Sequence, residues 1–284
     1  MPSSITCSDC KNEIPQPATC CPHCGRPGTY WNVIAAGKTE ERAALQIRHA
    51  AATANALARG ADAAVQNFES AVAGSNAVLS RPVEDVQRLA NSTRQLYTTY
   101  YQLIEAGLRL PDDNEWNIGR QLTDTVLFPN YKEHMRFAAL SLDGIGLSAY
   151  GSCSIQLRDD MIAHRASVFE ENSILFMERY EVKVSRKPGM PQGYKAIWED
   201  RAKLCTAKLA ARIDATTPPN QYSSLLLKQG VSSANDEFVE VHIWGPMSVL
   251  SIEKVTVTAS EAGVRQTILK AVTSQLLKHG VTVV

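Results

Sequence analysis

The chain has 284 residues, of which 44% are hydrophobic; this excludes a disordered polymer and leaves room for two domains or one domain with appendages. Lysine and arginine together number 29, as do aspartate and glutamate, so there is no overall charge to recruit nucleic acid or an anionic membrane. Any binding of that kind would need a local patch.

The sequence shows no sign of a secretory signal or a membrane span. The first residues lack the charged start and apolar run that a signal requires. The least charged long stretch, residues 138–157, is interrupted by Asp143 and by glycines and serines, so no membrane helix is expected there. Since most of the cysteines are in a metal-ligand spacing, we expect a reducing, cytoplasmic location.

That spacing lies at the start of the chain, where Cys-x-x-Cys is followed after ten residues by Cys-Pro-His-Cys-Gly. Two such turns can place four thiolates at the corners of a tetrahedron, which suits zinc. The simplest ligand set is Cys7, Cys10, Cys21 and Cys24, with Cys20 spare and His23 as a possible substitute. A segment this short cannot build its own core, so residues 1–30 are predicted to be a structural zinc ribbon folded by its metal. Its charges balance, which favours a protein contact or a structural tag over nucleic-acid binding.

Residues 35–109 are predicted to form an α-helical hairpin or a dimeric coiled coil. An alanine-rich helix over 35–79 carries a seam with steps of four and three, at positions 47, 51, 54, 58, 61, 65, 68, 72, 75 and 79. Ser80-Arg81-Pro82 breaks it, and a second helix is expected over 82–108. This part is interpreted as scaffold that makes a homodimer or holds an inhibitor.

At Leu110 the composition changes, and residues 110–284 are predicted to be an α+β domain. Its expected strands are 150–158, 165–173, 174–184, 223–227, 236–246 and 250–258. Its expected helices are 131–142, 194–213 and 261–278.

The strand over 236–246 holds the residues of greatest chemical interest. Successive side chains on a strand face opposite ways, so Phe238, Glu240 and His242 share one face, and Val239, Val241 and Ile243 share the other, which should be the core. A carboxylate and an imidazole on one face either line a cleft or belong to a solvated strand face.

Several motifs in this domain resemble a bacterial family of unassigned function that is related to ADP-ribosyltransferases. They are Tyr150-Gly-Ser-Cys-Ser-Ile-Gln-Leu-Arg, Arg165-Ala-Ser-Val-Phe, Asn172-Ser173 and Val239-Glu-Val-His-Ile-Trp-Gly. The likeness covers about residues 130–250, and order and spacing agree better than identities. It implies an ADP-ribosyltransferase-like split β-sheet domain that uses NAD as substrate.

By that resemblance Glu240 is the catalytic glutamate, and Tyr150, Gly151, Arg165 and Ser167 belong to the NAD-binding motifs. Arg120, His134 and Arg136 are all candidates for the first-motif residue, with Arg136 slightly favoured. The loop 229–236 takes the place of the target-recognition loop.

The resemblance also bears on the acceptor. Enzymes of this fold that modify arginine carry Glu or Gln two residues before the catalytic glutamate, where this chain has Phe238. The implied function is therefore transfer of ADP-ribose to a macromolecule, either nucleic acid or a non-arginine protein site, by a toxin or defence effector.

Two other interpretations stay open. Cys153 paired with His164 or His242 would give a cysteine hydrolase, but a cysteine between small residues in a strand is more typical of a core position. A non-enzymatic adaptor or nucleic-acid-binding protein, built from zinc ribbon and coiled coil, is the alternative from a different class.

Overall fold

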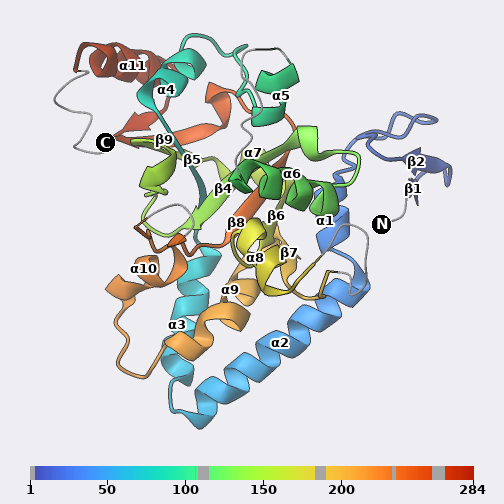
Figure 1. Ribbon diagram of the computed structural model, residues 1–284, viewed down its shortest axis with the longest axis vertical. Coiled ribbons are helices and arrows are strands. Elements are labelled where there is room, and N and C mark those ends of the chain that lie inside the picture. The colour runs from blue at the N-terminus through green and yellow to red at the C-terminus, as the bar shows by residue number, and fades with distance from the viewer. Residues whose placement is uncertain (1–3, 106, 108–114, 183–189, 232–234, 258–265) are drawn as a thin grey trace.

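The computed structural model describes residues 4–105, 107, 115–182, 190–231, 235–257 and 266–284 (Figure 1). Its strands are β1 (Ser4–Thr6), β2 (Glu13–Pro15), β3 (Asn76–Arg81), β4 (Met135–Ser141), β5 (Cys153–Leu157), β6 (Ala166–Phe169), β7 (Lys195–Ile197), β8 (Glu240–Trp244), β9 (Ile252–Val257) and β10 (Thr282–Val283). Its helices are α1 (Trp31–Ala36), α2 (Thr39–Ala58), α3 (Asp62–Ala73), α4 (Val83–Ala90), α5 (Tyr100–Glu105), α6 (Glu115–Leu127), α7 (Asp159–Ile162), α8 (Ser173–Arg179), α9 (Arg201–Leu209), α10 (Tyr222–Leu226) and α11 (Gln266–Lys278).

Among the described residues, eight strands form one mixed sheet at the centre of the molecule (Figure 1). The strand order is β10-β9-β5-β3-β4-β8-β6-β7. Neighbouring strands are antiparallel, except that β10 and β9 are parallel. The predicted α+β class is therefore confirmed. The resemblance implied a split sheet, whereas these strands are hydrogen-bonded continuously from β10 to β7.

Both faces of the central strand β8 are buried. Val241 and Ile243 join the main hydrophobic core, as does Val239 just before the strand, and this confirms the predicted core face. The opposite face carries Glu240, His242 and Trp244, and Trp244 packs in a second, aromatic-rich core. Glu240 and His242 are each only 3% exposed, so the interpretation as a solvated strand face is wrong.

Helices cover the sheet at two ends. Helices α2 and α3 pack on α9 at one end, and α4 packs on α11 at the other (Figure 1). No helix in the described part of the chain is long and apolar enough to cross a membrane.

The structure corrects the prediction of a helical hairpin or coiled coil over 35–109. Residues 76–81 form strand β3, which pairs with both β4 and β5 inside the sheet. The second predicted helix, over 82–108, is reduced to the short helices α4 and α5. The sheet thus takes strands from both sides of residue 110, so the boundary predicted there does not separate two independent units.

The predicted seam explains part of this error. Its first half faces solvent: Ile47 is 71% exposed, and Ala51, Ala54 and Ala58 are also exposed. Its second half is buried in the main core, through Val65, Phe68, Val72 and, in strand β3, Leu79. Only the part of the seam in α3 and β3 therefore corresponds to a face that packs on the core.

Three shorter predictions are also wrong. Residues 135–141 form β4 rather than helix, because their backbone pairs with β8 along most of its length. Residues 173–179 form helix α8 rather than a strand, since the Asn172 side chain accepts a hydrogen bond from the Ile174 amide at 3.0 Å and caps its start. Residues 222–226 form helix α10.

Most of the other elements agree with prediction. The expected strands around 150–158, 165–173, 236–246 and 250–258 appear as β5, β6, β8 and β9. The helix expected at 194–213 is correct only over α9, because residues 195–197 at its start form strand β7, which pairs with β6. The helix expected at 261–278 appears as α11, and its beginning lies outside the described residues.

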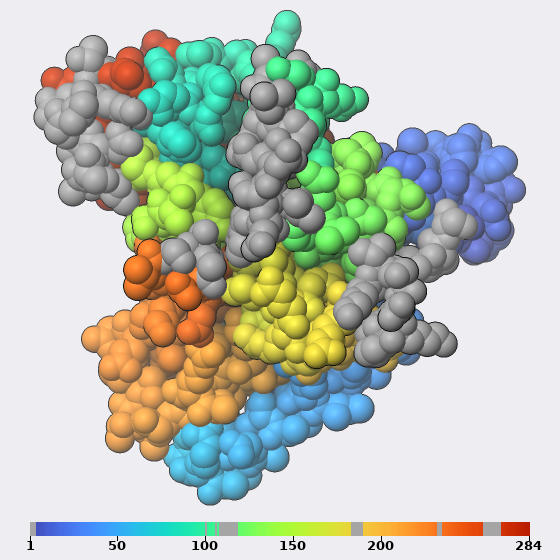
Figure 2. Space-filling view, in the orientation of Figure 1, coloured from blue at the N-terminus to red at the C-terminus, as the bar shows by residue number. Residues whose placement is uncertain are grey.

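The N-terminal hairpin of β1 and β2 forms a lobe on one side of the molecule (Figure 2). Trp31, at the start of α1, attaches this lobe to the sheet. Its indole Nε1 donates to the Ala18 carbonyl at 3.0 Å, and its ring is buried in the aromatic-rich core.

Candidate active site and metal site

The four predicted cysteine ligands meet in the N-terminal lobe. The Sγ atoms of Cys7, Cys10, Cys21 and Cys24 all lie within 4.8 Å of one another, with 3.7 Å between Cys7 and Cys24 and 3.5 Å between Cys10 and Cys21. Thiolates about 2.3 Å from a tetrahedral zinc ion would be about 3.8 Å apart. The four sulfurs can therefore hold a metal ion such as zinc. Cys20 and His23 lie outside this set.

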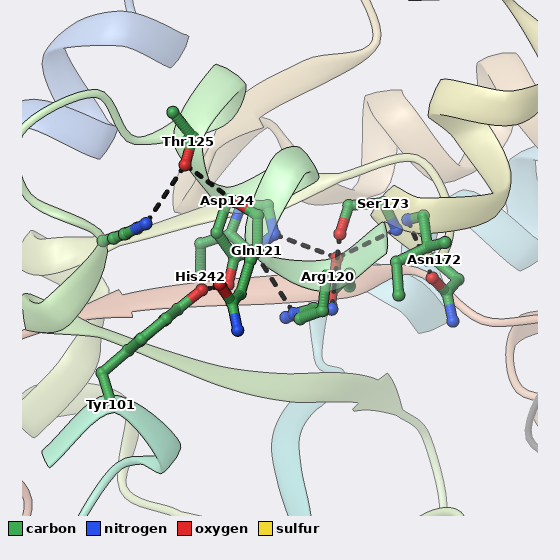
Figure 3. Close-up of polar contacts among 11 residues, drawn as sticks. Tyr101, Arg120, Gln121, Asp124, Thr125, Asn172, Ser173 and His242 are labelled. Atoms are coloured by element: carbon green, nitrogen blue, oxygen red, sulfur yellow. Dashed lines mark hydrogen bonds and ion pairs between the residues drawn. The ribbon is translucent and has the colours of Figure 1, made fainter. Parts of the chain in front are cut away.

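Glu240 is the first residue of β8, and its carboxylate contacts three donors. Figure 3 labels these donors, which are Arg120, Ser173 and His242. Its Oε1 is 3.1 Å from Arg120 Nη1. Its Oε2 accepts a hydrogen bond from the Ser173 amide at 3.1 Å and lies 3.2 Å from His242 Nε2. Helix α8 thus begins at this carboxylate, so the positive end of the helix faces the negative charge.

The donors keep Glu240 ionised. Burial by itself raises the pKa of a carboxyl group, but the charge of Arg120 and the hydrogen bonds from His242 and Ser173 outweigh it and lower the pKa of Glu240 to about 2. The carboxylate is therefore an anion at any physiological pH, in a position where water hardly reaches it.

Arg120 is itself held in place from helix α6. Its Nε lies 3.3 Å from Asp124 Oδ1, one helical turn further on, and its guanidinium lies 3.8 Å from the centre of the Phe137 ring. Tyr101 donates its hydroxyl to Asp124 Oδ2 at 2.7 Å (Figure 3). Burial lowers the pKa of Arg120, but the two carboxylates outweigh it and the pKa is raised. The guanidinium therefore stays protonated, and it pairs with both carboxylates.

His242 is a supporting residue rather than a free base. Its ring is enclosed by Phe128, Phe137 and Phe169, with ring centres 4.8, 5.5 and 5.8 Å away. Its Nε2 faces Glu240 Oε2, so the imidazole orients the carboxylate.

A cavity of about 190 Å³ opens beside Glu240, on the same face of the sheet. Aromatic side chains supply much of its wall, from Phe137, Tyr150 and Phe238. Its charged lining residues are Glu240, Arg120 and Arg81. The cavity is therefore a small aromatic pocket with one fixed anion and two cations.

Arg81 ends strand β3 at this cavity. Its Nη1 donates to the Ser80 carbonyl at 2.8 Å, and its Nη2 donates to the Tyr97 hydroxyl. Among the described residues, no carboxylate forms an ion pair with it, and burial lowers its pKa. Arg81 is thus a half-buried cation that forms no ion pair with a carboxylate of the described residues.

Two of the predicted NAD-binding residues belong to this region. Tyr150 lines the cavity. Gly151 has φ of +141°, and a Cβ there would lie 2.1 Å from the Arg81 carbonyl carbon. Only glycine lets the chain pass this close to Arg81, so the Tyr150-Gly151 motif and Arg81 are structurally linked.

The other three predicted NAD-binding residues do not line the cavity. Arg136 donates to the His134 carbonyl at 2.8 Å, and Arg165 donates to the carbonyls of Met161, Trp244 and Pro246. Ser167 is buried where it accepts a hydrogen bond from the Asn32 amide at 3.2 Å. The two arginines bind backbone carbonyls and Ser167 binds the Asn32 side chain, so none of the three side chains contacts Glu240.

The sequence interpretation missed Arg81 and left Arg120 as one of three alternatives. The β-branched and apolar residues Val78 and Leu79 before Arg81 are typical of a strand. The alanine-rich sequence around them favoured the prediction of a helix instead. Cys153 is buried in β5 and belongs to the main core, as expected.

Comparison with protein-family models finds no match, and comparison with curated proteins finds none either.

Proposed function

We propose that the chain is an NAD-dependent ADP-ribosyltransferase, with an ADP-ribosyltransferase-like domain, and that Glu240 is its catalytic residue. The observation that carries this proposal is the ionised, almost fully buried Glu240 in the wall of an aromatic cavity that also holds Arg81 and Arg120. The motifs around Tyr150 and Glu240 that resemble this family are the ones that meet there.

The cavity suits one ring of the substrate. Its volume of about 190 Å³ is below the range of about 300–1,000 Å³ for pockets that take drug-sized ligands, which favours a single planar ring such as nicotinamide. Tyr150 and Phe238 offer surfaces for stacking. Arginine binds phosphate well, so we assign the pyrophosphate to Arg81, which forms no ion pair with a carboxylate in the described ranges.

The chemistry requires a fixed anion at this place. When the bond between nicotinamide and ribose breaks, nicotinamide leaves as a neutral ring with the bonding electron pair, and positive charge develops on the ribose. A carboxylate held beside that charge stabilises it, as in glycoside hydrolysis. The acceptor's nucleophile then bonds to the ribose carbon and releases its proton.

Arg120 sets a condition on this reaction. It neutralises Glu240 Oε1 in the free protein, so the substrate has to draw the guanidinium towards its own phosphates before the carboxylate faces the ribose. Helix α6 would then move or its arginine would change rotamer.

The acceptor is a macromolecule, and Phe238 argues against arginine as the modified residue.

We further propose that zinc binds the four cysteines and acts only structurally, since the metal site lies in the separate N-terminal lobe. Metal analysis should find one zinc per chain, and its removal should unfold that lobe and leave the sheet intact.

Nicotinamide release from NAD tests the proposal, with purified full-length protein and with cell lysate fractions of DNA, RNA or protein added in turn. The fraction that takes up labelled ADP-ribose identifies the acceptor. Glu240→Gln should abolish release, while Glu253→Gln, an exposed carboxylate on β9, should leave it unchanged. If folded, zinc-loaded wild type neither binds NAD nor releases nicotinamide with any fraction, the enzyme proposal fails and the adaptor alternative stands.

A further inference from the structure

A second cavity, of about 410 Å³, lies where strand β6 ends and helix α8 begins. Its walls come from residues 170–179, from Lys208 and Arg212 near the end of α9, and from residues 235–237 before β8. It shares no lining residue with the cavity beside Glu240. Asn172 lines it, however, and the next residue, Ser173, donates its amide to Glu240. The two cavities are therefore close neighbours.

Two carboxylate oxygens of residues that line this second cavity have no hydrogen-bond donor in the described part of the chain. They are Glu171 Oε1 and Asp236 Oδ2, on residues only 6% and 3% exposed. The other oxygens are occupied, since Glu171 Oε2 lies 2.9 Å from Arg179 Nη2 and Asp236 Oδ1 accepts from the Gly230 amide at 2.8 Å. A buried carboxylate oxygen without a donor is unfavourable, so this cavity is short of donors.

The basic side chains around the cavity do not meet that need. Lys208 Nζ donates to the carbonyls of Glu170 and Phe238 at 2.6 and 3.2 Å. Arg212 pairs with Glu237. Glu170 and Glu237, the other two acidic lining residues, already have arginine partners, in Arg48 and Arg212. What is missing is therefore two donors at Glu171 and Asp236.

The arrangement favours an organic cation over a metal ion. In the described part of the chain, the four cysteines are the one group of three or more potential ligands whose atoms lie close enough to share an ion. A guanidinium group carries five N–H donors in a planar fork and can reach two separate carboxylates, whereas a metal ion requires its ligands at one point.

We propose that this cavity binds a guanidinium group, as carried by an arginine side chain, through Glu171 and Asp236. The binding does not require the reaction assigned to Glu240. If that reaction occurs, the arginine is an anchor for a protein partner beside the catalytic cavity, and another side chain of the partner is modified.

Calorimetric titration of the full chain with a Gly-Arg-Gly peptide tests the proposal, with Gly-citrulline-Gly as the neutral isostere and Gly-Lys-Gly as a second cation. Free arginine amide separates a side-chain site from one that also reads the peptide backbone. Saturable binding of the arginine ligands is expected, with citrulline at least about tenfold weaker because charge-assisted hydrogen bonds are lost.

Glu171→Gln and Asp236→Asn should each weaken the arginine peptide at least about tenfold. Glu237→Gln is the matched control: it lines the same cavity, but both of its oxygens are already paired with Arg212 and Lys228, so affinity should be unchanged. Circular dichroism confirms that each variant is folded.

Equal affinity for arginine and citrulline, tighter binding of lysine, or no saturable binding at millimolar peptide would overturn the proposal and leave a cavity filled by water. Glu240→Gln should bind the peptide like wild type. Loss of nicotinamide release with retained arginine binding would therefore refute only the enzyme proposal, and the reverse result would refute only this one.

Discussion

Glu240 and Glu171 are two buried glutamates next to the same short stretch, Asn172–Ser173, and their pKa values are shifted in opposite directions. Their exposed fractions are similar, 3% and 6%. Glu240 has donors from Arg120, Ser173 and His242, and its pKa is lowered to about 2. Glu171 has Arg179 on one oxygen and no donor on the other, and burial raises its pKa. Fixed donors, more than burial, decide which of the two is a permanent anion.

Removing the main donor of each glutamate should have very different effects. Arg120→Met leaves both Glu240 and Asp124 without their cation and should lower the free energy of unfolding by about 3 kcal/mol. Arg179→Met removes a partner whose own side chain is 59% exposed, so water can take its place beside Glu171, and should cost about 1 kcal/mol. Urea unfolding at pH 7 measures both values. Similar losses in the two variants would show that the two glutamates are held alike.

The pH dependence of stability should reveal the lowered pKa of Glu240. Its ordinary pKa is about 4.3 and its folded value about 2, a difference worth about 3 kcal/mol. Since the folded pKa is the lower one, this stabilisation is present above the ordinary pKa and is lost as pH falls towards 2. The difference in unfolding free energy between wild type and Glu240→Gln should therefore shrink as the pH is lowered from about 5 to about 3. A constant difference would contradict the lowered pKa.

Glu171→Gln should act in the opposite direction. Because burial raises the folded pKa of Glu171, the ionised form is unfavourable in the folded state above the ordinary pKa, and the penalty disappears below it. At pH 7 the variant should be more stable than wild type by up to about 1 kcal/mol, and near pH 4 the two should be equal. A clear loss of stability at pH 7 would mean that Glu171 is as well satisfied as Glu240. A gain, together with weaker arginine binding, would mark a residue kept for binding at some cost in stability.

The sequence allowed a good prediction of β8 and of the metal site because local pattern and chemistry coincide there. The alternation of Val239, Val241 and Ile243 predicted the core face, and the spacing of the cysteines predicted the metal site. Both signals are local, so they can be read from a few residues.

The rest depended on contacts between distant segments. Strand β3 lies in an alanine-rich region, and only its pairing with β4 and β5 makes it a strand. Because β3 was predicted as helix, Arg81 was not recognised as a site residue. It lines the same cavity as Glu240, which lies about 160 residues further along the chain. Likewise, two of the three donors of Glu240 come from α6 and α8, and no local pattern connects Arg120 or Ser173 with it.

The most direct test of the central claim is to measure NAD affinity and nicotinamide release together, in wild type and in Glu240→Gln. If the ionised Glu240 stabilises the developing charge on ribose, the variant should bind NAD with an affinity close to that of wild type and release nicotinamide at least about 100-fold more slowly. Equal release by the two proteins, or a variant that fails only because it no longer binds NAD, would contradict a catalytic role for Glu240.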